Sequence, residues 1–236
     1  MELSKTAASR HPKSTENDVH TSADSMSSDI YTRDGTAIAV FHGSTGHGLL
    51  AYGGQPGMPA GFVDIGPDGH GTEYQPFEGT VRKVTVTVAR TAQAVEIRLA
   101  RGDDDHAHHE TQGWTLGRDA PAPDARARLA GVYRGTVHAQ GEAGTIDVSI
   151  DEAGRIATRV PGNCAVSGQL SDAAAARQPR AYPLSSAVSL RVSGPRHCLP
   201  GGKALTGECL GFGPRLLAVC RTDAGGMLFL GERTDA

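Results

Sequence analysis

The sequence is poor in aromatic residues and carries little net charge, and both shortages limit what the chain can do. Aromatic side chains make up 5% of the 236 residues, and the formal net charge is −3. A core must therefore rest on aliphatic side chains, and scarce rings argue against a flat hydrophobic ligand, which aromatic residues normally grip. Because there is no basic excess to meet a phosphate backbone, we expect no nucleic acid partner.

Long apolar runs are also missing. No stretch approaches the roughly 20 apolar residues of a membrane-spanning helix, so we predict no transmembrane helix. The start, Met-Glu-Leu-Ser-Lys, lacks the apolar segment of a signal peptide and by itself predicts a cytoplasmic protein. The even number of cysteines and the polar, spacer-like start instead favour the bacterial envelope, the periplasm or secretion, with an export signal outside the given sequence. We favour this second interpretation.

Familiar catalytic motifs are absent from the sequence. Gly201-Gly202-Lys203 does not have the spacing of a phosphate-binding loop, and Gly43-Ser-Thr-Gly46 does not have that of a nucleophile elbow. No His-Glu-x-x-His pair occurs, and no two carboxylates are placed in a way that implies acid–base catalysis. We therefore expect a protein without enzymatic activity.

What the sequence does contain is glycine, proline and a two-residue hydrophobic alternation. The 31 glycines and 13 prolines indicate many turns and exclude long helices. Apolar and polar residues alternate at 84–88, 95–99, 146–150 and 188–192, which is the period of a strand with one buried face. Only Ser171–Arg177 has a helical pattern. The predicted fold class is all-β, with antiparallel units that are small barrels or sandwiches.

The composition divides the chain into four segments. Residues 1–28 hold almost no apolar side chains and are predicted to be a disordered polar tail. Residues 29–119 form an N-terminal β unit, and residues 120–128, with two prolines, form a linker. Residues 129–236 are predicted to form an eight-stranded, barrel-like unit. Its predicted strands are Val132–Val137, Thr145–Ile150, Ile156–Val160, Ala165–Leu170, Ala187–Val192, Leu205–Leu210, Leu216–Cys220 and Met227–Leu230.

An internal repeat links the two β units. Three blocks recur in the same order: Gly61–Gly71 with Gly144–Gly154, Gly79–Val81 with Gly162–Cys164, and Ala94–Leu99 with Ala187–Val192. A weaker similarity, outside this order, relates Tyr31–Asp34 to Cys220–Asp223. The first pair contains Asp-x-x-Gly after a strand, where the carboxylate accepts local backbone N–H groups and the glycine supplies a positive φ. The blocks favour an internal duplication; the alternative is convergence among glycine-rich hairpins.

The cysteines all fall in the last third of the chain, at positions 164, 198, 209 and 220. If the strands on either side of Gly213-Pro214 pair so that Phe212 opposes Leu217, Cys209 lies opposite Cys220 and a disulfide can close. Cys164 and Cys198 would then form the second disulfide. The alternative is four reduced, buried thiols that act as small apolar side chains.

One polar segment, Asp103–Glu110, is the main candidate for metal chemistry. It follows the predicted strand at 95–100 and is therefore predicted to be a loop. Imidazole and carboxylate groups suit Zn²⁺, Ni²⁺ or Cu²⁺, and the candidate ligands are Asp103, Asp105, His106, His108 and His109. The alternative is a solvated connector. We expect no cofactor unless this segment binds a divalent metal.

These observations lead to two hypotheses of different classes. The first is a non-catalytic binding or structural protein, which recognises a protein partner or a small ligand through its barrel loops. The second is a metal-handling protein or enzyme that uses the 103–110 segment together with His42, His47 and His70. The position of these histidines distinguishes the two, because the second hypothesis requires them to converge with His106 in one place.

Overall fold

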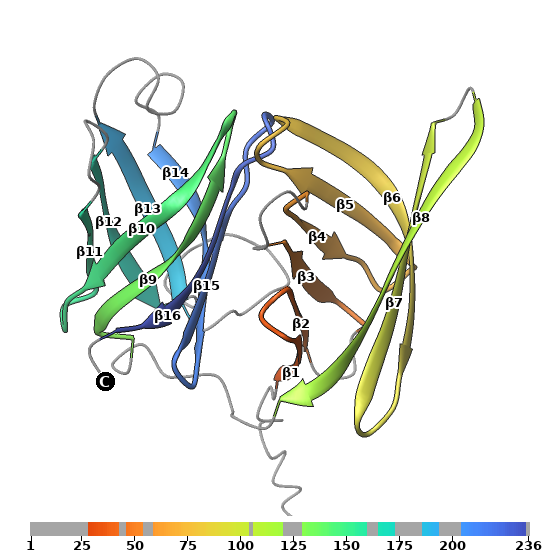
Figure 1. The fold of residues 1–236 in the computed structure, drawn as a ribbon, viewed down its shortest axis with the longest axis horizontal. Helices are drawn as coiled ribbons and strands as arrows, with labels where there is room; N and C mark the ends of the chain where they lie inside the picture. Colours follow the sequence, from red (N-terminus) through yellow and green to blue (C-terminus); the bar gives the residue numbers. More distant parts are fainter. Residues whose placement is uncertain are drawn as a thin grey trace, which may run out of the picture.

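The computed structural model describes residues 28–42, 46–53, 59–103, 106–119, 129–159, 165–172, 186–193 and 204–234. These residues form two closed antiparallel barrels of eight strands each, which lie side by side (Figure 1). The first barrel consists of β1 (Ser28–Arg33), β2 (Ala37–His42), β3 (Gly48–Tyr52), β4 (Gly61–Ile65), β5 (His70–Gln75), β6 (Thr80–Arg90), β7 (Ala94–Asp103) and β8 (His106–Asp119). The second consists of β9 (Gly131–Ala139), β10 (Glu142–Ile150), β11 (Arg155–Arg159), β12 (Ala165–Asp172), β13 (Ser186–Ser193), β14 (Ala204–Phe212), β15 (Arg215–Cys220) and β16 (Met227–Arg233).

The all-β prediction is confirmed, and the eight strands predicted for the C-terminal unit correspond one to one with β9–β16. Neighbours in sequence are hydrogen-bonded neighbours in space, and β1 pairs with β8 as β9 pairs with β16, so neither sheet keeps a free edge. The predicted helix at Ser171–Arg177 begins inside β12, and its remaining residues lie outside the described part of the chain. Among the described residues there is no helix with the length and apolarity to span a membrane.

The repeated blocks occupy hairpins that are displaced around the ring. The block at Gly61–Gly71 covers β4 and the start of β5, the fourth and fifth strands of the first barrel, whereas its counterpart at Gly144–Gly154 covers β10, the second strand of the second barrel. Ala94–Leu99 lies on β7 and Ala187–Val192 on β13, and Tyr31–Asp34 covers the end of β1 as Cys220–Asp223 begins at the end of β15, again a shift of two strand positions. Gly162–Cys164 lies outside the described residues. In a closed antiparallel ring, a shift by two strands preserves strand direction. The repeated blocks therefore occupy equivalent parts of hairpins, at ring positions that differ by two strands.

The turn chemistry predicted for these hairpins is largely confirmed. Asp68 Oδ1 accepts a hydrogen bond from His70 N at 3.1 Å, and Asp151 Oδ1 accepts one from Arg155 N at 2.8 Å. Gly154 has the expected positive φ of 79°. In the first hairpin, however, Gly69 and not Gly71 takes the positive φ, because the turn is already complete before β5 begins.

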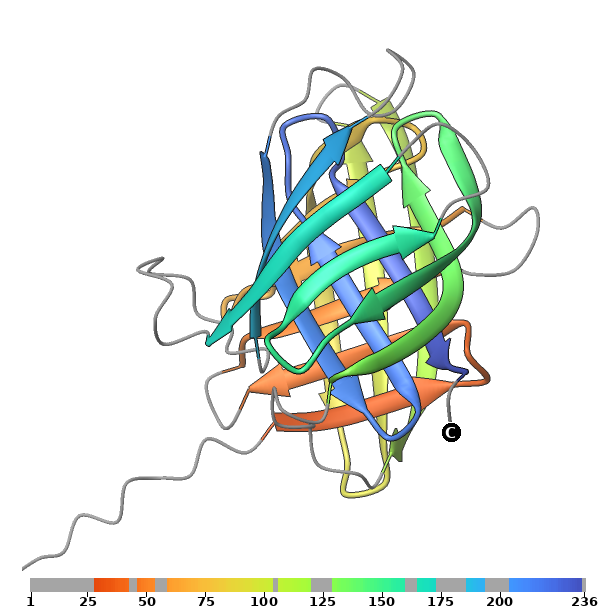
Figure 2. The same ribbon diagram turned by 90° about the vertical axis from the view of Figure 1, so that its left-hand side faces the viewer.

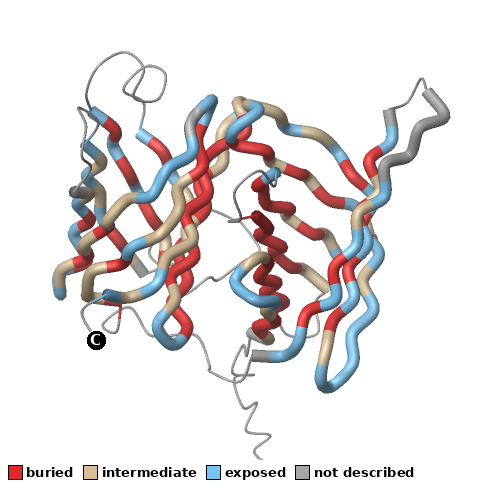
Figure 3. The backbone as a smooth tube through the Cα atoms, viewed as in Figure 1, coloured by how far each residue is buried: buried red, intermediate tan, exposed pale blue. Residues whose placement is uncertain are grey.

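The two barrels share an apolar contact, called here the inter-barrel core. The strands of the two contacting faces cross at a large angle (Figure 2), and buried backbone is concentrated where they meet (Figure 3). The side chains come from outward positions of β1–β4 in one barrel and of β14–β16 in the other. They are Ile30, Ile38, Val40, Leu49, Ala51, Ala60 and Phe62 on one side and Leu210, Phe212, Leu217, Val219 and Leu228 on the other.

A buried ion pair adds to this contact. Arg221, which directly follows β15, donates to both carboxylate oxygens of Asp64 on β4, at 2.6 and 2.5 Å. The guanidinium also lies 3.4 Å from Glu208 on β14 and 6.0 Å from the centre of the Phe62 ring. Charge pairing and apolar burial therefore act on the same contact between the two barrels.

Candidate functional site

The interior of the second barrel contains a cavity of about 610 Å³. This volume falls within the roughly 300–1,000 Å³ typical of small-molecule sites in proteins. Every strand from β9 to β16 contributes to its wall. The apolar residues of the wall include Val137, Ile146, Val148, Ile156, Val166, Val188, Leu190, Leu216, Ala218, Met227 and Phe229.

Strand alternation aims these side chains inward, but they do not fill the barrel. In β13, Val188, Leu190 and Val192 face the interior and are buried, as the two-residue period predicts. Val166 and Ala218 also line the cavity but are only partly buried. An inward-facing side chain with accessible surface borders open space, so the interior of the second barrel is hollow and not close-packed.

The distribution of the few aromatic rings explains why the second barrel is hollow. The interior of an eight-stranded barrel is just wide enough for side chains to fill or to hold one small ligand. Four rings, those of Tyr31, Phe41, Tyr52 and Trp114, belong to the interior cluster of the first barrel. The corresponding cluster of the second barrel has two, Tyr133 and Phe229, and otherwise consists mainly of aliphatic side chains. Smaller side chains on the same frame leave the volume that forms the cavity.

A hydrogen-bonded cluster of Leu129, Tyr133 and Arg233 lies at the end of the second barrel where β9 begins and β16 ends. The Tyr133 hydroxyl donates to the Leu129 carbonyl at 3.2 Å and accepts from Arg233 Nη2 at 2.7 Å. The Arg233 guanidinium also lies 5.3 Å from the centre of the Tyr133 ring. Both Leu129 and Tyr133 are almost completely buried. These residues occupy this end of the barrel.

The opposite end carries the turn between β9 and β10, and the cavity wall is open there. Gly141, Ala143 and Gly144 line the cavity and are exposed to solvent. A residue of the other barrel, Phe77 in the connection from β5 to β6, completes this part of the wall. The turns of the two barrels are joined by a backbone hydrogen bond from Gly141 N to Phe77 O at 2.9 Å.

The chemistry of the wall is apolar and uncharged. Its inward polar side chains, among the described residues, are the hydroxyl of Thr158 and the thiol of Cys209, whereas Thr145 lies at the rim on the exposed, outward face of β10. Burial raises the pKa of the Cys209 thiol to about 12, so the thiol is neutral and a poor nucleophile at neutral pH. This wall suits the binding of an apolar molecule and supplies no acid–base pair.

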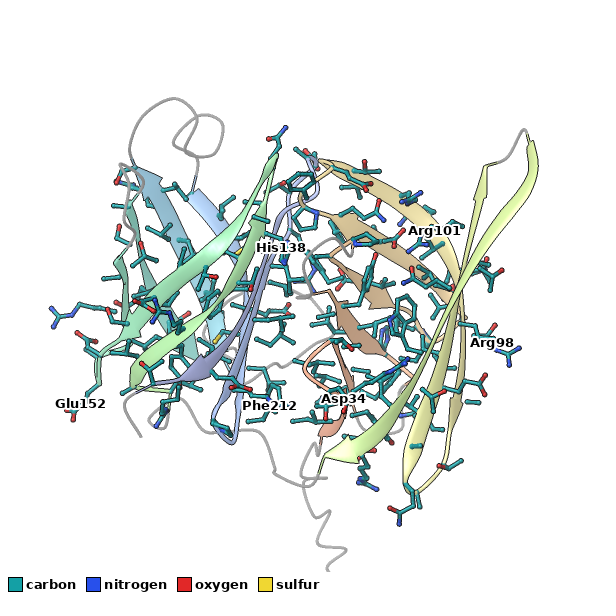
Figure 4. All side chains as sticks on the ribbon, viewed as in Figure 1. Asp34, Arg98, Arg101, His138, Glu152 and Phe212 are labelled. Carbon is teal, nitrogen blue, oxygen red and sulfur yellow. The ribbon has the colours of Figure 1, made fainter. Side chains whose placement is uncertain are left out.

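The first barrel differs because one end of its interior holds a buried polar cluster around Glu73. The Glu73 side chain is inaccessible to solvent, and its two oxygens accept hydrogen bonds from Arg101 at 2.6 and 2.8 Å. Tyr52 donates to the same carboxylate, and Arg82 Nε lies 2.8 Å from it. Arg101 also donates to Gln112 at 2.9 Å. Figure 4 labels Arg101, which lies on β7 of the first barrel.

Within this cluster, the Glu73 carboxyl and the Arg101 guanidinium are held in their ionised forms. Burial alone would raise the pKa of Glu73, but hydrogen bonds from Arg101 and Tyr52 outweigh it, and the pKa of the carboxyl is lowered. Burial and the adjacent carboxylate raise the pKa of Tyr52, and the hydrogen bonds to Glu73 raise that of Arg101. Because Glu73, Arg101, Tyr52 and Gln112 hydrogen-bond to one another, these side chains are suited to fill the interior of the first barrel.

A smaller hollow of about 270 Å³ lies at this end of the first barrel, with Arg33, Asp34 and Trp114 on its wall. Tyr52 and Gln112 also line it, but their side chains are engaged in the Glu73 cluster. Its volume is less than half that of the cavity in the second barrel, so the second barrel is the stronger candidate site.

The predicted metal-binding segment occupies a different kind of structure from the loop we expected. Asp103 ends β7 and His106 begins β8, and the two residues pair across the hairpin. His108 and His109 belong to β8, so the loop prediction was wrong for these residues, because the strand pairing extends further than the apolar alternation. Asp105 and the side chains of Asp103–Glu110 lie outside the described structure. Elsewhere in the described residues, no group of three or more histidine, cysteine or acidic side chains is placed to hold a metal.

The histidines of the second hypothesis do not converge. His42 ends β2, His47 precedes β3 and His70 begins β5, so these three lie on connections at one end of the first barrel. His106 begins β8 after the β7–β8 turn, which is at the opposite end of an antiparallel barrel. The arrangement required for a shared site with His106 is therefore absent.

The cysteine prediction was wrong for the pair that the structure describes. Phe212 pairs with Arg215 and not with Leu217, because the β14–β15 turn contains only Gly213 and Pro214. Cys209 therefore opposes Ala218, two positions from Cys220, and the two buried cysteines form no disulfide with each other. The other proposed pair, Cys164 and Cys198, lies outside the described residues.

The residues that line the cavity were not recognised as a site from the sequence. The alternation identified many of them as inward-facing, but it does not report how much space remains between opposite walls. The available signal was the scarcity of rings in residues 129–236 compared with residues 29–119. Comparison with known proteins adds no further assignment, since no family model, no curated protein and no solved structure matches the chain.

Proposed function

We propose that the protein binds a small, uncharged, apolar molecule inside its second barrel. The observation that carries this proposal is the cavity of about 610 Å³, whose wall is almost entirely aliphatic and which is open beside the β9–β10 turn. A hollow apolar interior gains free energy when an apolar molecule replaces water in it, by roughly 25 cal/mol for each Å² removed from water. This makes the protein a binding protein, as the first sequence hypothesis expects, with recognition inside the barrel.

The wall also indicates the charge of the ligand. A carboxylate or ammonium group inside the barrel would lose its hydration without gaining an opposite charge, because the described wall residues are all uncharged. Thr158 supplies a hydroxyl group that suits a hydroxyl or carbonyl of a neutral ligand. The wall is mainly aliphatic, so it suits an apolar molecule with an aliphatic chain, such as a long-chain alcohol.

A titration with a neutral fluorophore tests the proposal. N-phenyl-1-naphthylamine is uncharged, and its emission increases when it leaves water. We expect saturable binding to the wild-type protein, and competition by long-chain alcohols in preference to the corresponding carboxylates. Absence of saturable binding, or equal competition by the carboxylates, would contradict the proposal.

A pair of tryptophan variants locates the bound fluorophore. Ala218→Trp places a large ring in the cavity, and we expect the affinity to fall at least about tenfold, which corresponds to about 1.4 kcal/mol. Ala157→Trp is the matched control: Ala157 is exposed on β11, between the wall residues Ile156 and Thr158, and faces away from the cavity. Circular dichroism checks that both variants are folded. Equal affinities of the two variants would place the fluorophore outside the barrel.

A further inference from the structure

Phe77 stands out among the apolar residues of the first barrel because it is exposed. Its side chain is 52% accessible, and Val81 at 36% is the other large hydrophobic side chain exposed in the described structure. An exposed ring is unfavourable by itself, since it keeps apolar surface in contact with water. Phe77 nevertheless lines the cavity of the second barrel, although it belongs to the first.

Backbone contacts hold the Phe77 turn against the second barrel. The Phe77 carbonyl accepts the 2.9 Å hydrogen bond from Gly141 described above. The connection between β15 and β16 approaches the same region so closely that a Cβ at Gly225 would lie 2.7 Å from the carbonyl oxygen of Gln75. The position of the Phe77 turn relative to the cavity is thus set by the contact between the barrels.

The β9–β10 hairpin of the second barrel provides no comparable bulk at this edge. The neighbouring wall residues of the β9–β10 hairpin are small: Ala139, Gly141, Ala143 and Gly144. A turn of glycine and alanine leaves the cavity accessible. Met227, at the start of β16, is buried in the wall at the same end, whereas the ring of Phe77 is an exposed bulky apolar group beside this opening.

We infer that Phe77 is the retaining residue of the binding site: the first barrel supplies the rim across which a ligand leaves the second barrel. This inference rests on the proposed function. Contact with a bound apolar molecule would cover the exposed ring, and the ring must lose that contact before the ligand can leave. The two barrels therefore form one binding unit, in which the first barrel sets the lifetime of the complex.

Stopped-flow measurements with N-phenyl-1-naphthylamine test this role in the full-length protein. We expect Phe77→Ala to raise the dissociation rate about fivefold, a change in line with the loss of part of the contact area of one ring. The association rate should not fall, because the substitution widens the opening. Phe77→Leu, which restores apolar bulk, should return the dissociation rate to within about twofold of wild type.

Val81→Ala is the matched control, because Val81 is the other exposed large hydrophobic residue of the first barrel and does not line the cavity. We expect its dissociation rate to equal that of wild type. Wild-type binding with equal dissociation rates in Phe77→Ala and Val81→Ala would overturn the role of Phe77 and leave the proposed function intact. No saturable binding to the wild-type protein would overturn both.

Discussion

Substitution of Glu73 tests whether the buried polar cluster is needed for the stability of the first barrel. Glu73→Gln keeps the shape of the side chain but removes the charge that compensates Arg101, which is only 6% exposed. Removing one partner of a buried ion pair typically costs about 3–5 kcal/mol, because the remaining charge stays desolvated without compensation. Arg82 contributes less to this cost, since its side chain is 35% exposed and water can solvate it.

Trp114 provides the assay for this prediction. It is the only tryptophan of the chain, it is buried in the first barrel, and its ring centre lies 5.0 Å from that of Tyr52. Urea unfolding followed by its fluorescence therefore reports on the barrel that contains Glu73. Because typical domains are stable by about 5–15 kcal/mol, a loss of 3–5 kcal/mol will shift the urea midpoint clearly.

Two further variants make this prediction specific. Glu96→Gln removes the same charge from an exposed pair with Arg98, and we expect a cost below about 1 kcal/mol. The double variant Glu73→Gln/Arg101→Met removes the uncompensated charge, and it should be more stable than Glu73→Gln alone. If Glu73→Gln costs no more than Glu96→Gln, or if the double variant is no more stable than the single one, the reasoning about a buried charge is wrong.

Two other predictions concern a histidine and the two described cysteines. His138 lies on β9, between the two barrels (Figure 4). Its Nε2 atom is buried without a hydrogen-bond partner. Burial lowers the pKa of the imidazole below the ordinary 6.5. The unfolded chain therefore binds the proton more readily than the folded chain, so the free energy of unfolding should fall as the pH drops below about 6.5. Urea unfolding at pH 7.5 and at pH 5.5 measures this change. The decrease in the free energy of unfolding between the two pH values should be smaller for His138→Leu than for wild type. The second prediction uses a variant in which Cys164 and Cys198 are replaced by serine. In this variant Cys209 and Cys220 should not react with Ellman's reagent at pH 8 until urea is added, because burial raises the pKa of both thiols to about 12. Rapid reaction of the folded protein would show that the thiols are accessible.

Local pattern was sufficient to predict most of the strands, because inward and outward positions alternate along a single segment, but it missed the start of β8 and the end of β12. Val188, Leu190 and Val192 show this directly, since their predicted and observed inward faces coincide. The pairing of strands was less predictable. Cys209 and Cys220 are two residues out of the predicted register because a two-residue turn replaced a longer one, and such a change moves both thiols without altering any hydrophobic pattern.

The candidate site was beyond the reach of such local patterns. Leu216 and Val166 could be assigned to an interior from their own segments, but the empty volume between them depends on the size of every side chain around the ring. Phe77 was still less predictable, since its role comes from a contact between two barrels that are far apart in sequence.

The amino-acid sequence by itself determined the strand content and the side of each strand that faces inward, because both follow from neighbouring residues. Tertiary structure alone decided that the strands close into two barrels, that the barrels share a core, and that one of them is hollow beside Phe77. The physical reason is that closure, register and empty volume are properties of many distant residues packed together.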